Sequence, residues 1–369
     1  MKNLLILIDA DFVGGAETNY KYILPILEEK GWKLIFVTHG HKNLEAYFDK
    51  QNIRIQMVSN FEPYYSLSEK GRFSFRNFMK NLISIQRNRV ILKKIISEYK
   101  PVAIISNSMI SHWLLSLVSS NHGFRKVMHL HDIVNRERVW GLYGIGLDQI
   151  TKRMDRIIVV SDAVRQKLHP KSKTKITKLF NPVEVNLTER ESKNAIKSEF
   201  IQLGMFARYT PWKGHREFLK IANELQDPVY KFICYGNPDG NEDYFKELVN
   251  TADSLQNRER IHLNNFSYDV AADMGKCGLI LHLSVLPEPL SRILIEANAL
   301  GIPVYAYDGG GTRELFETLK LAGVLVKTGD YRQMIEEIKQ FPSKTFKFPS
   351  LKEITPEMYA SKFEAVLQN

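Results

Sequence analysis

The stretch from Pro287 to Glu314 reads PEPLSRILIEANALGIPVYAYDGGGTRE, and its alternation of turn, helix and strand signals decides the fold. Ser291 is a favourable N-cap residue, the residues after it are apolar at helical spacing, and Gly301 is a stop signal. These signals predict a helix over 291–300. The apolar run 303–307 predicts a buried strand directly after it.

Two glutamates in this stretch, Glu288 and Glu296, form the pattern E-x7-E. Pro289 keeps Glu288 on the loop before the helix, whereas Glu296 lies one to two turns inside it. The first turn between them has free backbone N–H groups at the positive end of a helix dipole. This geometry suits an anionic diphosphate with a hydroxyl-binding carboxylate on each side. A solvated Glu on a surface helix fits the bare pair equally well.

The chain repeats one supersecondary plan. In the first half a strand over 3–9 enters the loop GGAET, then a helix to residue 30 and a strand over 33–38. In the second half a strand over 200–207 enters a loop over 208–214, then a helix to residue 225 and a strand over 229–235. Such units predict two doubly wound parallel-sheet α/β domains whose ligand loops face a shared cleft. Further strands are expected over 102–106, 126–130, 156–161 and 278–283.

The 369 residues are enough for two domains. Asn181-Pro182 breaks regular structure, and residues 185–199 are polar and charged. We therefore expect an N-terminal domain over 1–180, a C-terminal domain over 181–350 and a closing segment over 351–369.

Two cations lie in the loop ARYTPWKG, where Arg208 and Lys213 follow a predicted strand. A guanidinium fork and a point ammonium suit a diphosphate leaving group. The alternative is a pair of solvated loop cations. Trp212 between them is expected to pack rather than to stack on a base.

The glycines of GGAET, Gly14 and Gly15, permit close approach of the backbone to a phosphate, although a plain turn explains them too. They do not form the G-x-G-x-x-G dinucleotide fingerprint, so a dehydrogenase loses its main support.

Two patterns raise the possibility of a metal. HLHDI contains His129 and His131 on one side of a strand, and Asp9 and Asp11 form a D-x-D string. Imidazole and carboxylate groups are usable ligands. We nevertheless expect no metal site, and His129 is expected to be structural.

These motifs together resemble glycosyltransferase family 4, whose members are retaining enzymes of the GT-B fold. The resemblance covers most of the chain and is strongest over 204–314. The motifs that match the family are GGAE, the Arg208 and Lys213 loop, PEP with Ser284, the Glu296-Ala297 pair, GIPV at 301–304 and GG-x-x-E at 310–314. The chain departs from the family at Leu290 and Ser291, where an aromatic residue and a glycine are usual, and at Leu283, where proline is usual. The identity of the donor sugar therefore stays open.

The resemblance implies a role for each matched residue. Glu296 would bind ribose hydroxyls, Glu288 sugar hydroxyls, and His131 would support the reacting sugar. The diphosphate would be held by Arg208, Lys213, the backbone near Leu290, Ser291, Arg292 and Ile293, and Gly15. Of these, Glu288, His131, Arg208 and Lys213 would be catalytic.

The implied reaction is retaining transfer from a nucleotide-diphosphate sugar, UDP favoured over GDP, without metal or cofactor. The acceptor would be a glycan or a lipid-linked molecule. The basic segment over 70–100, described next, is the reason to expect a role in bacterial surface polysaccharide or glycolipid synthesis. The alternatives are an epimerase or phosphorylase on the same fold, or a non-catalytic protein that binds membranes or polymers.

The net charge of +10 is concentrated between Lys70 and Lys100, which contains nine Lys and Arg residues and one acid among apolar residues. This segment fits an amphipathic helix on an anionic membrane, and equally a core-packing helix with a solvated basic face. No nucleic-acid motif accompanies it.

Two cysteines give no disulfide framework, and no apolar run reaches the length of a membrane span. We expect a cytoplasmic protein, with the inner face of the plasma membrane as its place of attachment.

Overall fold

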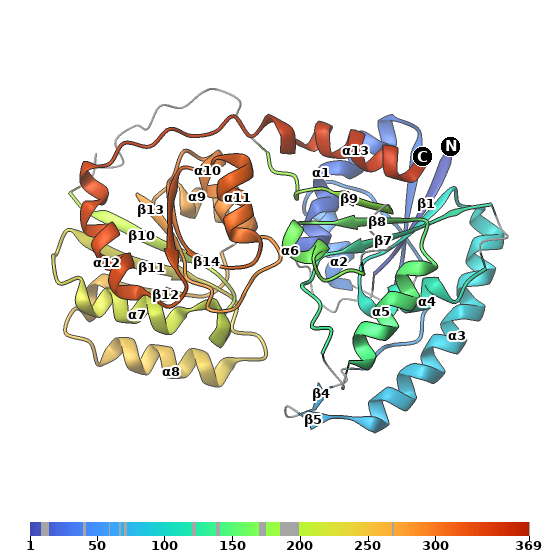
Figure 1. Cartoon of the computed structure of the whole chain (residues 1–369), viewed down its shortest axis with the longest axis horizontal. Helices are drawn as coiled ribbons and strands as arrows, with labels where there is room; N and C mark the ends of the chain where they lie inside the picture. Colours follow the sequence, from blue (N-terminus) through green and yellow to red (C-terminus); the bar gives the residue numbers. More distant parts are fainter. Residues whose placement is uncertain are drawn as a thin grey trace. The chain divides into compact units, whose positions relative to one another are not determined.

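The computed structural model describes residues 1–8, 15–39, 42–58, 60–65, 68–69, 72–119, 123–137, 141–169, 175–184, 199–267 and 269–368. The chain forms two compact units (Figure 1). Unit 1 comprises Met1–Pro182 and Pro356–Asn369, and unit 2 comprises Val183–Thr355. Each unit is an α/β domain around its own parallel sheet.

The sheet of unit 1 has seven strands in the order β3-β2-β1-β6-β7-β8-β9, all paired in parallel. Burial of both faces by helices favours such parallel strands, which read as apolar runs. The strands are β1 (Lys2–Leu7), β2 (Trp32–Val37), β3 (Gln56–Val58), β6 (Ala103–Ser106), β7 (Arg125–Leu130), β8 (Arg156–Val159) and β9 (Ile176–Lys178). A separate hairpin joins β4 (Ser68–Glu69) to β5 (Arg72–Phe73).

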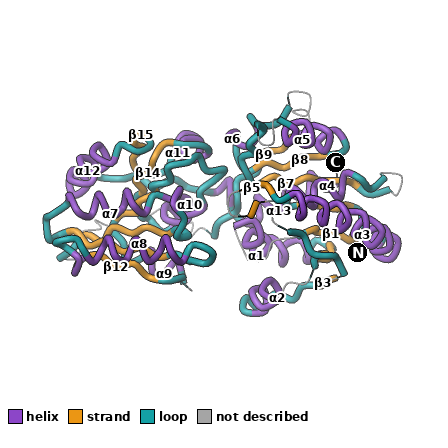
Figure 2. Tube along the Cα trace, turned by 90° about the horizontal axis from the view of Figure 1, so that it is seen from below, coloured by secondary structure: helices purple, strands orange, loops and turns teal. Residues whose placement is uncertain are grey.

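The helices of unit 1 cover both faces of this sheet (Figure 2). They are α1 (Gly15–Glu29), α2 (Lys42–Asp49), α3 (Phe75–Tyr99), α4 (Met109–Ser116), α5 (Leu142–Lys152), α6 (Asp162–Arg165) and α13 (Pro356–Gln368). The last of these, α13, packs against α1 and places Phe363 and Leu367 in the apolar core of the N-terminal strands. Glu364 on α13 also accepts a hydrogen bond from Trp32 Nε1 at 2.9 Å.

The sheet of unit 2 has six parallel strands in the order β12-β11-β10-β13-β14-β15. They are β10 (Ile201–Phe206), β11 (Tyr230–Tyr235), β12 (Ile261–Asn264), β13 (Leu279–His282), β14 (Val304–Asp308) and β15 (Gly323–Lys327). The helices are α7 (His215–Glu224), α8 (Glu242–Asp253), α9 (Val270–Met274), α10 (Arg292–Ala299), α11 (Gly311–Leu319) and α12 (Tyr331–Gln340). Helical 3-10 turns occur at η2 (Pro211–Lys213), η3 (Arg258–Arg260), η4 (Phe341–Ser343) and η5 (Lys352–Ile354).

The strand order reverses direction once in each sheet. Unit 2 builds outward from β10 in one direction through β11 and β12, and in the other through β13, β14 and β15. Unit 1 reverses between β1 and β6 in the same way. Doubly wound domains bind ligands just outside the carboxyl ends of the two strands at such a reversal. The fold therefore directs attention to the loops after β10 and β13.

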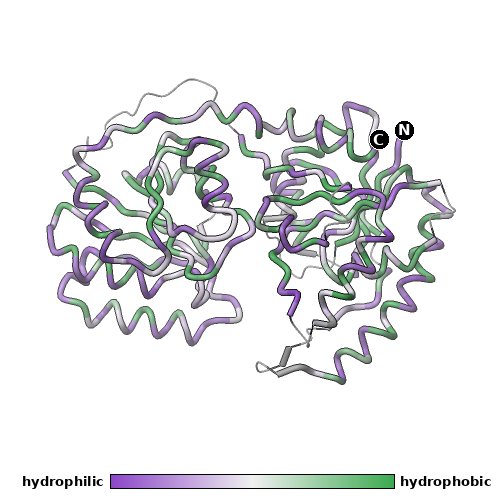
Figure 3. The backbone as a smooth tube through the Cα atoms, viewed as in Figure 1, coloured by the Kyte–Doolittle hydropathy of each residue, from purple (hydrophilic) through white to green (hydrophobic). Residues whose placement is uncertain are grey.

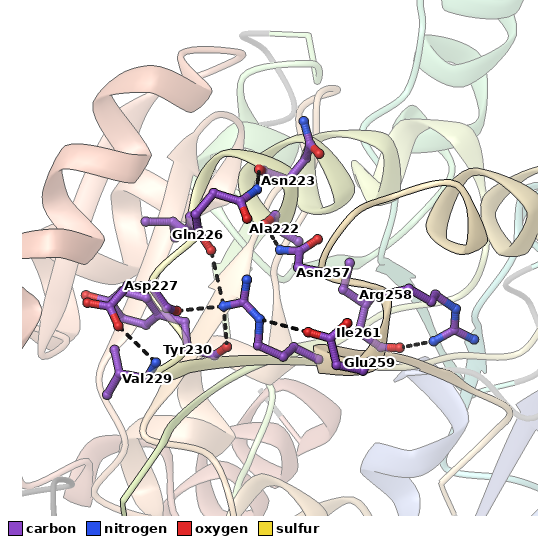
Figure 4. A network of polar contacts seen from close by, with 12 residues as sticks. Ala222, Asn223, Gln226, Asp227, Val229, Tyr230, Asn257, Arg258, Glu259 and Ile261 are labelled. Atoms are coloured by element: carbon purple, nitrogen blue, oxygen red, sulfur yellow. Dashed lines mark hydrogen bonds and ion pairs between the residues drawn. The ribbon is translucent and has the colours of Figure 1, made fainter.

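A polar network stabilises the unit 2 sheet at the amino ends of its strands, opposite the carboxyl ends where ligands bind (Figure 4). The Arg260 guanidinium donates to the backbone carbonyls of Asp227 at 2.6 Å and Tyr230 at 3.3 Å. Asn257 Nδ2 donates to the Ala222 carbonyl at 2.5 Å, and Val229 N donates to Asp227 Oδ1 at 3.0 Å. These bonds tie the end of α7 to the starts of β11 and β12, so they support the sheet away from the ligand edge.

The prediction of two parallel-sheet α/β domains is confirmed. The helix expected over 291–300 is α10, with Ser291 at its N-cap and Leu300 at its C-cap. Hydrophobic residues concentrate along the sheet strands of each unit (Figure 3), which is why apolar runs located the strands.

Candidate functional site

The loops that follow β10 and β13 are joined to each other. Val285 N donates to the Trp212 carbonyl at 2.8 Å. Gly214 has φ +88°, and a Cβ there would lie 1.9 Å from the Leu283 carbonyl oxygen. Only glycine combines this backbone conformation with so close an approach. The two loops therefore form one surface at the strand reversal.

An ion pair lies at this surface. Lys213 Nζ donates to Glu288 Oε1 at 2.7 Å, and the two side chains are only 16% and 6% exposed. The Lys213 ammonium also lies 4.3 Å from the centroid of the Trp212 ring. Ser284 Oγ donates to the same carboxylate oxygen. Burial acts to raise the pKa of Glu288, but neighbouring His282, Lys213 and Ser284 outweigh it and hold that pKa below its ordinary value. Glu288 is thus an anion at neutral pH.

His282, the last residue of β13, is a member of this cluster that the sequence motifs did not reveal. Its Nε2 lies 3.3 Å from Glu288 Oε1, and its Nδ1 lies 3.4 Å from Ser291 Oγ. Burial lowers the pKa of His282 despite the nearby carboxylate of Glu288. The ring is therefore uncharged at neutral pH, where Lys213 and Ser284 hold Glu288 ionised, and it lies between Glu288 and the start of α10. The one signal in the sequence was its position at the end of a buried strand.

The two glycines at the start of α11, the N-cap Gly310 and the first helical residue Gly311, fix the backbone of Glu288. Gly311 N donates to the Glu288 carbonyl at 2.7 Å, and Glu288 forms an isolated parallel bridge with Gly310. Gly310 has φ +61°, and a Cβ there would lie 2.1 Å from the Glu288 carbonyl oxygen. The glycine run thus holds the extended Glu288 segment in place from the β14 side.

Helix α10 presents its first turn at the same edge. Ser291 is the N-cap, but its hydroxyl makes no capping hydrogen bond to the helix and turns instead to His282. Leu290 and Ser291 are buried, whereas Arg292 and Ile293 are half-buried. One turn later, Glu296 Oε1 accepts from Arg292 Nε at 3.2 Å and from Nη2 at 3.1 Å. The first backbone N–H groups of α10 therefore donate no hydrogen bond to the N-cap side chain, and the Arg292–Glu296 ion pair lies beside them.

Arg208 extends from the loop after β10 and is exposed. The next residue, Tyr209, is fully buried, and its hydroxyl donates to the Asn264 carbonyl at 2.7 Å. Tyr209 N also donates to the Asn237 carbonyl at 3.0 Å. A buried anchor thus fixes the backbone between the two cations of this loop.

The remaining predicted site residues belong to unit 1. His131 follows β7, and its Nε2 lies 3.4 Å from Asn107 Oδ1, which also accepts from the Tyr20 hydroxyl at 3.1 Å. Its ring centroid lies 3.9 Å from that of His129. Burial lowers the pKa of His131 to about 4, so the ring is neutral. Gly15 is the first residue of α1.

Gly14, Asp9 and Asp11 lie outside the described residues. Within the described part of the chain, no group of three or more His, Cys, Asp or Glu side chains is arranged to hold a metal ion.

The structure thus brings Lys213, Glu288 and Ser291 together through His282, with Arg208 on the same loop as Lys213 and Glu296 one turn into α10. Two cations, a helix start and two carboxylates at one sheet edge can bind a polar ligand that carries both anionic groups and hydroxyls. In unit 1, His131 follows β7 and Gly15 is the first residue of α1.

Two family models match the sequence. Residues 13–187 match the model described as Glycosyltransferase Family 4, and residues 187–354 match the model described as Glycosyl transferases group 1. No curated protein sequence matches the chain.

Several solved structures are similar over the whole chain. HepE of Anabaena, crystallised with UDP and glucose, has a TM-score of 0.78 at 19% identity, with 100% of both chains covered. A glycosyltransferase of Rickettsia africae has a TM-score of 0.74 at 17% identity, covering 100% of this chain and 99% of that one. TarM of S. aureus, in complex with fondaparinux, α-GlcNAc-glycerol and UDP, has a TM-score of 0.69 at 14% identity, with 100% of both chains covered. At these identities the likeness shows a shared fold.

Proposed function

Because the chain belongs to glycosyltransferase family 4 and has the GT-B fold, we propose that it is a retaining enzyme that transfers a sugar from a nucleotide-diphosphate donor to a hydroxyl group. The observation that carries this proposal is the buried Lys213–Glu288 ion pair beside the start of α10. It concentrates phosphate-binding and hydroxyl-binding groups at the strand reversal of unit 2.

The diphosphate is assigned to the cationic side of the site. Arg208 and Lys213 neutralise the charge that develops on the departing nucleotide, and the backbone N–H groups from Leu290 to Ile293 donate hydrogen bonds to the phosphate oxygens. When a phosphate binds Lys213, Glu288 shares its cation with the ligand, and the Ser284 hydroxyl remains as a hydrogen-bond donor to the carboxylate. Gly15 of unit 1 is proposed to approach the phosphate through its backbone.

The hydroxyl groups are assigned to the carboxylates. Glu296 binds the ribose, and Arg292 orients its carboxylate from the preceding turn. Glu288 binds the sugar hydroxyls, and His131 of unit 1 supports the reacting sugar. UDP is favoured as the nucleotide, and the UDP complexes of HepE and TarM support this choice.

The proposed chemistry rests on position and charge. Glu288 is held ionised by Lys213, so it is unsuited to donate a proton to a leaving group. We assign the acceptor proton to the donor phosphate itself in a front-face attack, with catalysis coming from alignment and stabilisation of the leaving group. The reaction needs no metal or further cofactor in this scheme.

The acceptor is proposed to be a glycan or a lipid-linked molecule at the cytoplasmic face of the membrane, in surface polysaccharide or glycolipid synthesis. No helix in the described ranges is long and apolar enough to cross a membrane. The fondaparinux and α-GlcNAc-glycerol in the TarM complex support an acceptor of the glycan type.

A thermal-shift screen with UDP, GDP and their sugars tests the donor assignment. We expect UDP and one UDP-sugar to raise the unfolding temperature of the wild type, and Lys213→Gln to remove that shift. A donor then supplied with candidate acceptors distinguishes transfer from epimerisation, because only transfer releases free UDP together with a new glycoside. Nucleotides that produce no shift would favour a non-catalytic protein.

A further inference from the structure

Helix α3 packs on unit 1 through a mixed face, whose buried residues are Asn77, Asn81, Ser84, Ile85, Asn88, Leu92, Ile95 and Ile96. Asn81 Oδ1 accepts from Tyr65 N at 2.8 Å, and its Nδ2 donates to the Tyr65 carbonyl at 2.9 Å. Asn88 makes the same two-way contact with the backbone of Glu62, at 2.7 and 3.0 Å. Both asparagines are buried. The helix is thus held against residues 62–65 by amide groups, which fixes the direction in which its other face points.

The opposite face of α3 is apolar and exposed. Its large side chains are Phe75 at 67%, Met79 at 44%, Ile83 at 53% and Val90 at 58% exposure. Their spacing places them on one stripe of the helix, about 22 Å long. A helix that serves only to cover a sheet turns its apolar stripe inward. Helix α3 does bury apolar residues, namely Ile85, Leu92, Ile95 and Ile96, but it carries this second apolar stripe on its outer face. An exposed apolar stripe of this size indicates an interaction surface.

Positive charge flanks this stripe. Helix α3 carries six Lys and Arg residues and one acid, Glu98, near its end. Arg76, Arg87, Lys93 and Lys94 are exposed, and Arg87 has a loose contact of 3.4 Å with Glu62. The helix lies at the periphery of unit 1 in two perpendicular views (Figures 1 and 2). The apolar stripe and the flanking cations are therefore both available to a binding partner.

We infer that α3 is a docking surface for an anionic lipid bilayer, on which it lies parallel to the surface. The apolar stripe enters the boundary between headgroups and acyl chains, and the flanking cations contact lipid phosphates. This inference stands on the helix alone and does not depend on the proposed transfer reaction. If the acceptor is lipid-linked, such docking also keeps unit 1 at the surface where the acceptor resides.

Other occupants fit this face less well. A second copy of the chain would bring two helices of equal positive charge together, which opposes association. A nucleic acid would satisfy the cations but leave the stripe from Phe75 to Val90 in water. An anionic bilayer contacts the cations through its phosphates and buries the apolar stripe among its acyl chains.

The test is sedimentation of the full chain with vesicles of phosphatidylcholine, alone or mixed in equal parts with phosphatidylglycerol. Salt is set at about 0.1 M and about 1 M, between which the screening length falls from about 10 Å to about 3 Å. One variant reverses three cations, Arg87→Glu, Lys93→Glu and Lys94→Glu. Its control reverses three exposed lysines of unit 2 and changes net charge equally: Lys339→Glu, Lys347→Glu and Lys352→Glu.

A second variant tests the stripe with Ile83→Gln and Val90→Gln. Its control is Ile145→Gln, which changes an isoleucine of unit 1 that is 59% exposed on α5. Because all these side chains are exposed, the variants are expected to fold, and an unchanged unfolding temperature checks this. An unchanged UDP-induced shift checks that unit 2 is intact, so failure of docking is distinguishable from failure of the proposed function.

We expect the wild type to sediment with anionic vesicles at low salt and not with neutral ones. Reversal of the three α3 cations should weaken binding about 100-fold or more, whereas the unit 2 control should retain it. The stripe variant should weaken binding to anionic vesicles at about 0.1 M salt, where its net charge equals that of the wild type, and Ile145→Gln should not. Wild type that stays in the supernatant at low salt, or equal losses in variant and control, would overturn the inference. So would an α3-dependent dimer in light scattering, which would assign the stripe to a second copy.

Discussion

Removal of the Lys213 ammonium should destabilise unit 2 in a manner that depends on pH. In Lys213→Ala the carboxylate of Glu288 stays buried, with its side chain 6% exposed, but loses its cation. Breaking a buried pair by deleting one partner typically costs about 3–5 kcal/mol. The wild-type pair contributes stability above the ordinary carboxyl pKa and loses it as pH falls through the lowered pKa of Glu288.

The variant can relieve the buried charge by taking up a proton, and this limits the penalty. For a carboxyl of ordinary pKa near 4.3, protonation costs about 3.7 kcal/mol at pH 7 and about 1 kcal/mol at pH 5. Without Lys213, burial dominates and the pKa of Glu288 rises above its ordinary value. The variant therefore loses stability as pH increases, and the gap to the wild type widens from pH 5 to pH 7.

Thermal unfolding of the full chain at pH 5 and pH 7 measures this gap. At about 2–4 °C per kcal/mol for a domain of this size, the midpoint of unit 2 should fall by about 7–15 °C at pH 7 and by about 2–4 °C at pH 5. Lys220→Ala is the matched control, because Lys220 is 55% exposed and its surface pair with Glu217 contributes about 0–1 kcal/mol.

The double variant Lys213→Ala/Glu288→Gln removes both charges and should recover much of the lost stability at pH 7. A gap of equal size at pH 5 and pH 7, or a double variant as unstable at pH 7 as the single one, would refute the role assigned to the buried charge.

Four further outcomes are expected. Arg208→Ala should lower the rate of UDP release at saturating donor by about 10²–10³-fold, and a rate near that of the wild type would remove Arg208 from the reaction. Gly214→Ala should lower the unfolding temperature or the soluble yield, because its φ is +88° and a Cβ has no room there; an equally stable variant would contradict this packing. Acid should destabilise unit 1 below about pH 6.5, because burial lowers the pKa of His112 to about 3 and that of His131 to about 4, so the unfolded chain takes up protons that the folded chain does not. Urea unfolding that is equally favourable at pH 7 and pH 5 would contradict this. Transfer should continue in EDTA, and a loss restored by Mn²⁺ or Mg²⁺ would return attention to Asp9 and Asp11.

Local patterns in the sequence were sufficient for the architecture. Apolar runs marked β1, β10 and β13 to within one or two residues at most ends, because parallel strands buried on both faces have no polar alternation to obscure them. The start of α10 followed from Ser291 and from Pro289 before it. These sequence signals depend on a few neighbouring residues, and the strands and the helix form where the signals predict them.

Contacts between residues that are distant in the sequence could not be predicted from local patterns. Lys213 and Glu288 were assigned to different parts of a ligand, and no local pattern shows that they pair across 75 positions. Nor does any motif mark His282, whose importance comes from its neighbours in space. Ser291 is the N-cap as expected, yet its hydroxyl serves His282 rather than the helix. Tertiary packing decided these partners.

The position of α13 has a consequence for biosynthesis. Unit 1 is discontinuous in sequence, and Tyr359, Phe363 and Leu367 complete a core whose other members are made first. Domains usually fold in the order in which they leave the ribosome. In this chain the later, uninterrupted unit 2 can finish folding while the earlier unit still waits for its last helix. Nascent unit 1 therefore exposes an unfinished apolar face throughout synthesis of unit 2, and premature termination just before Pro356 would leave the first-made domain, rather than the last, incomplete.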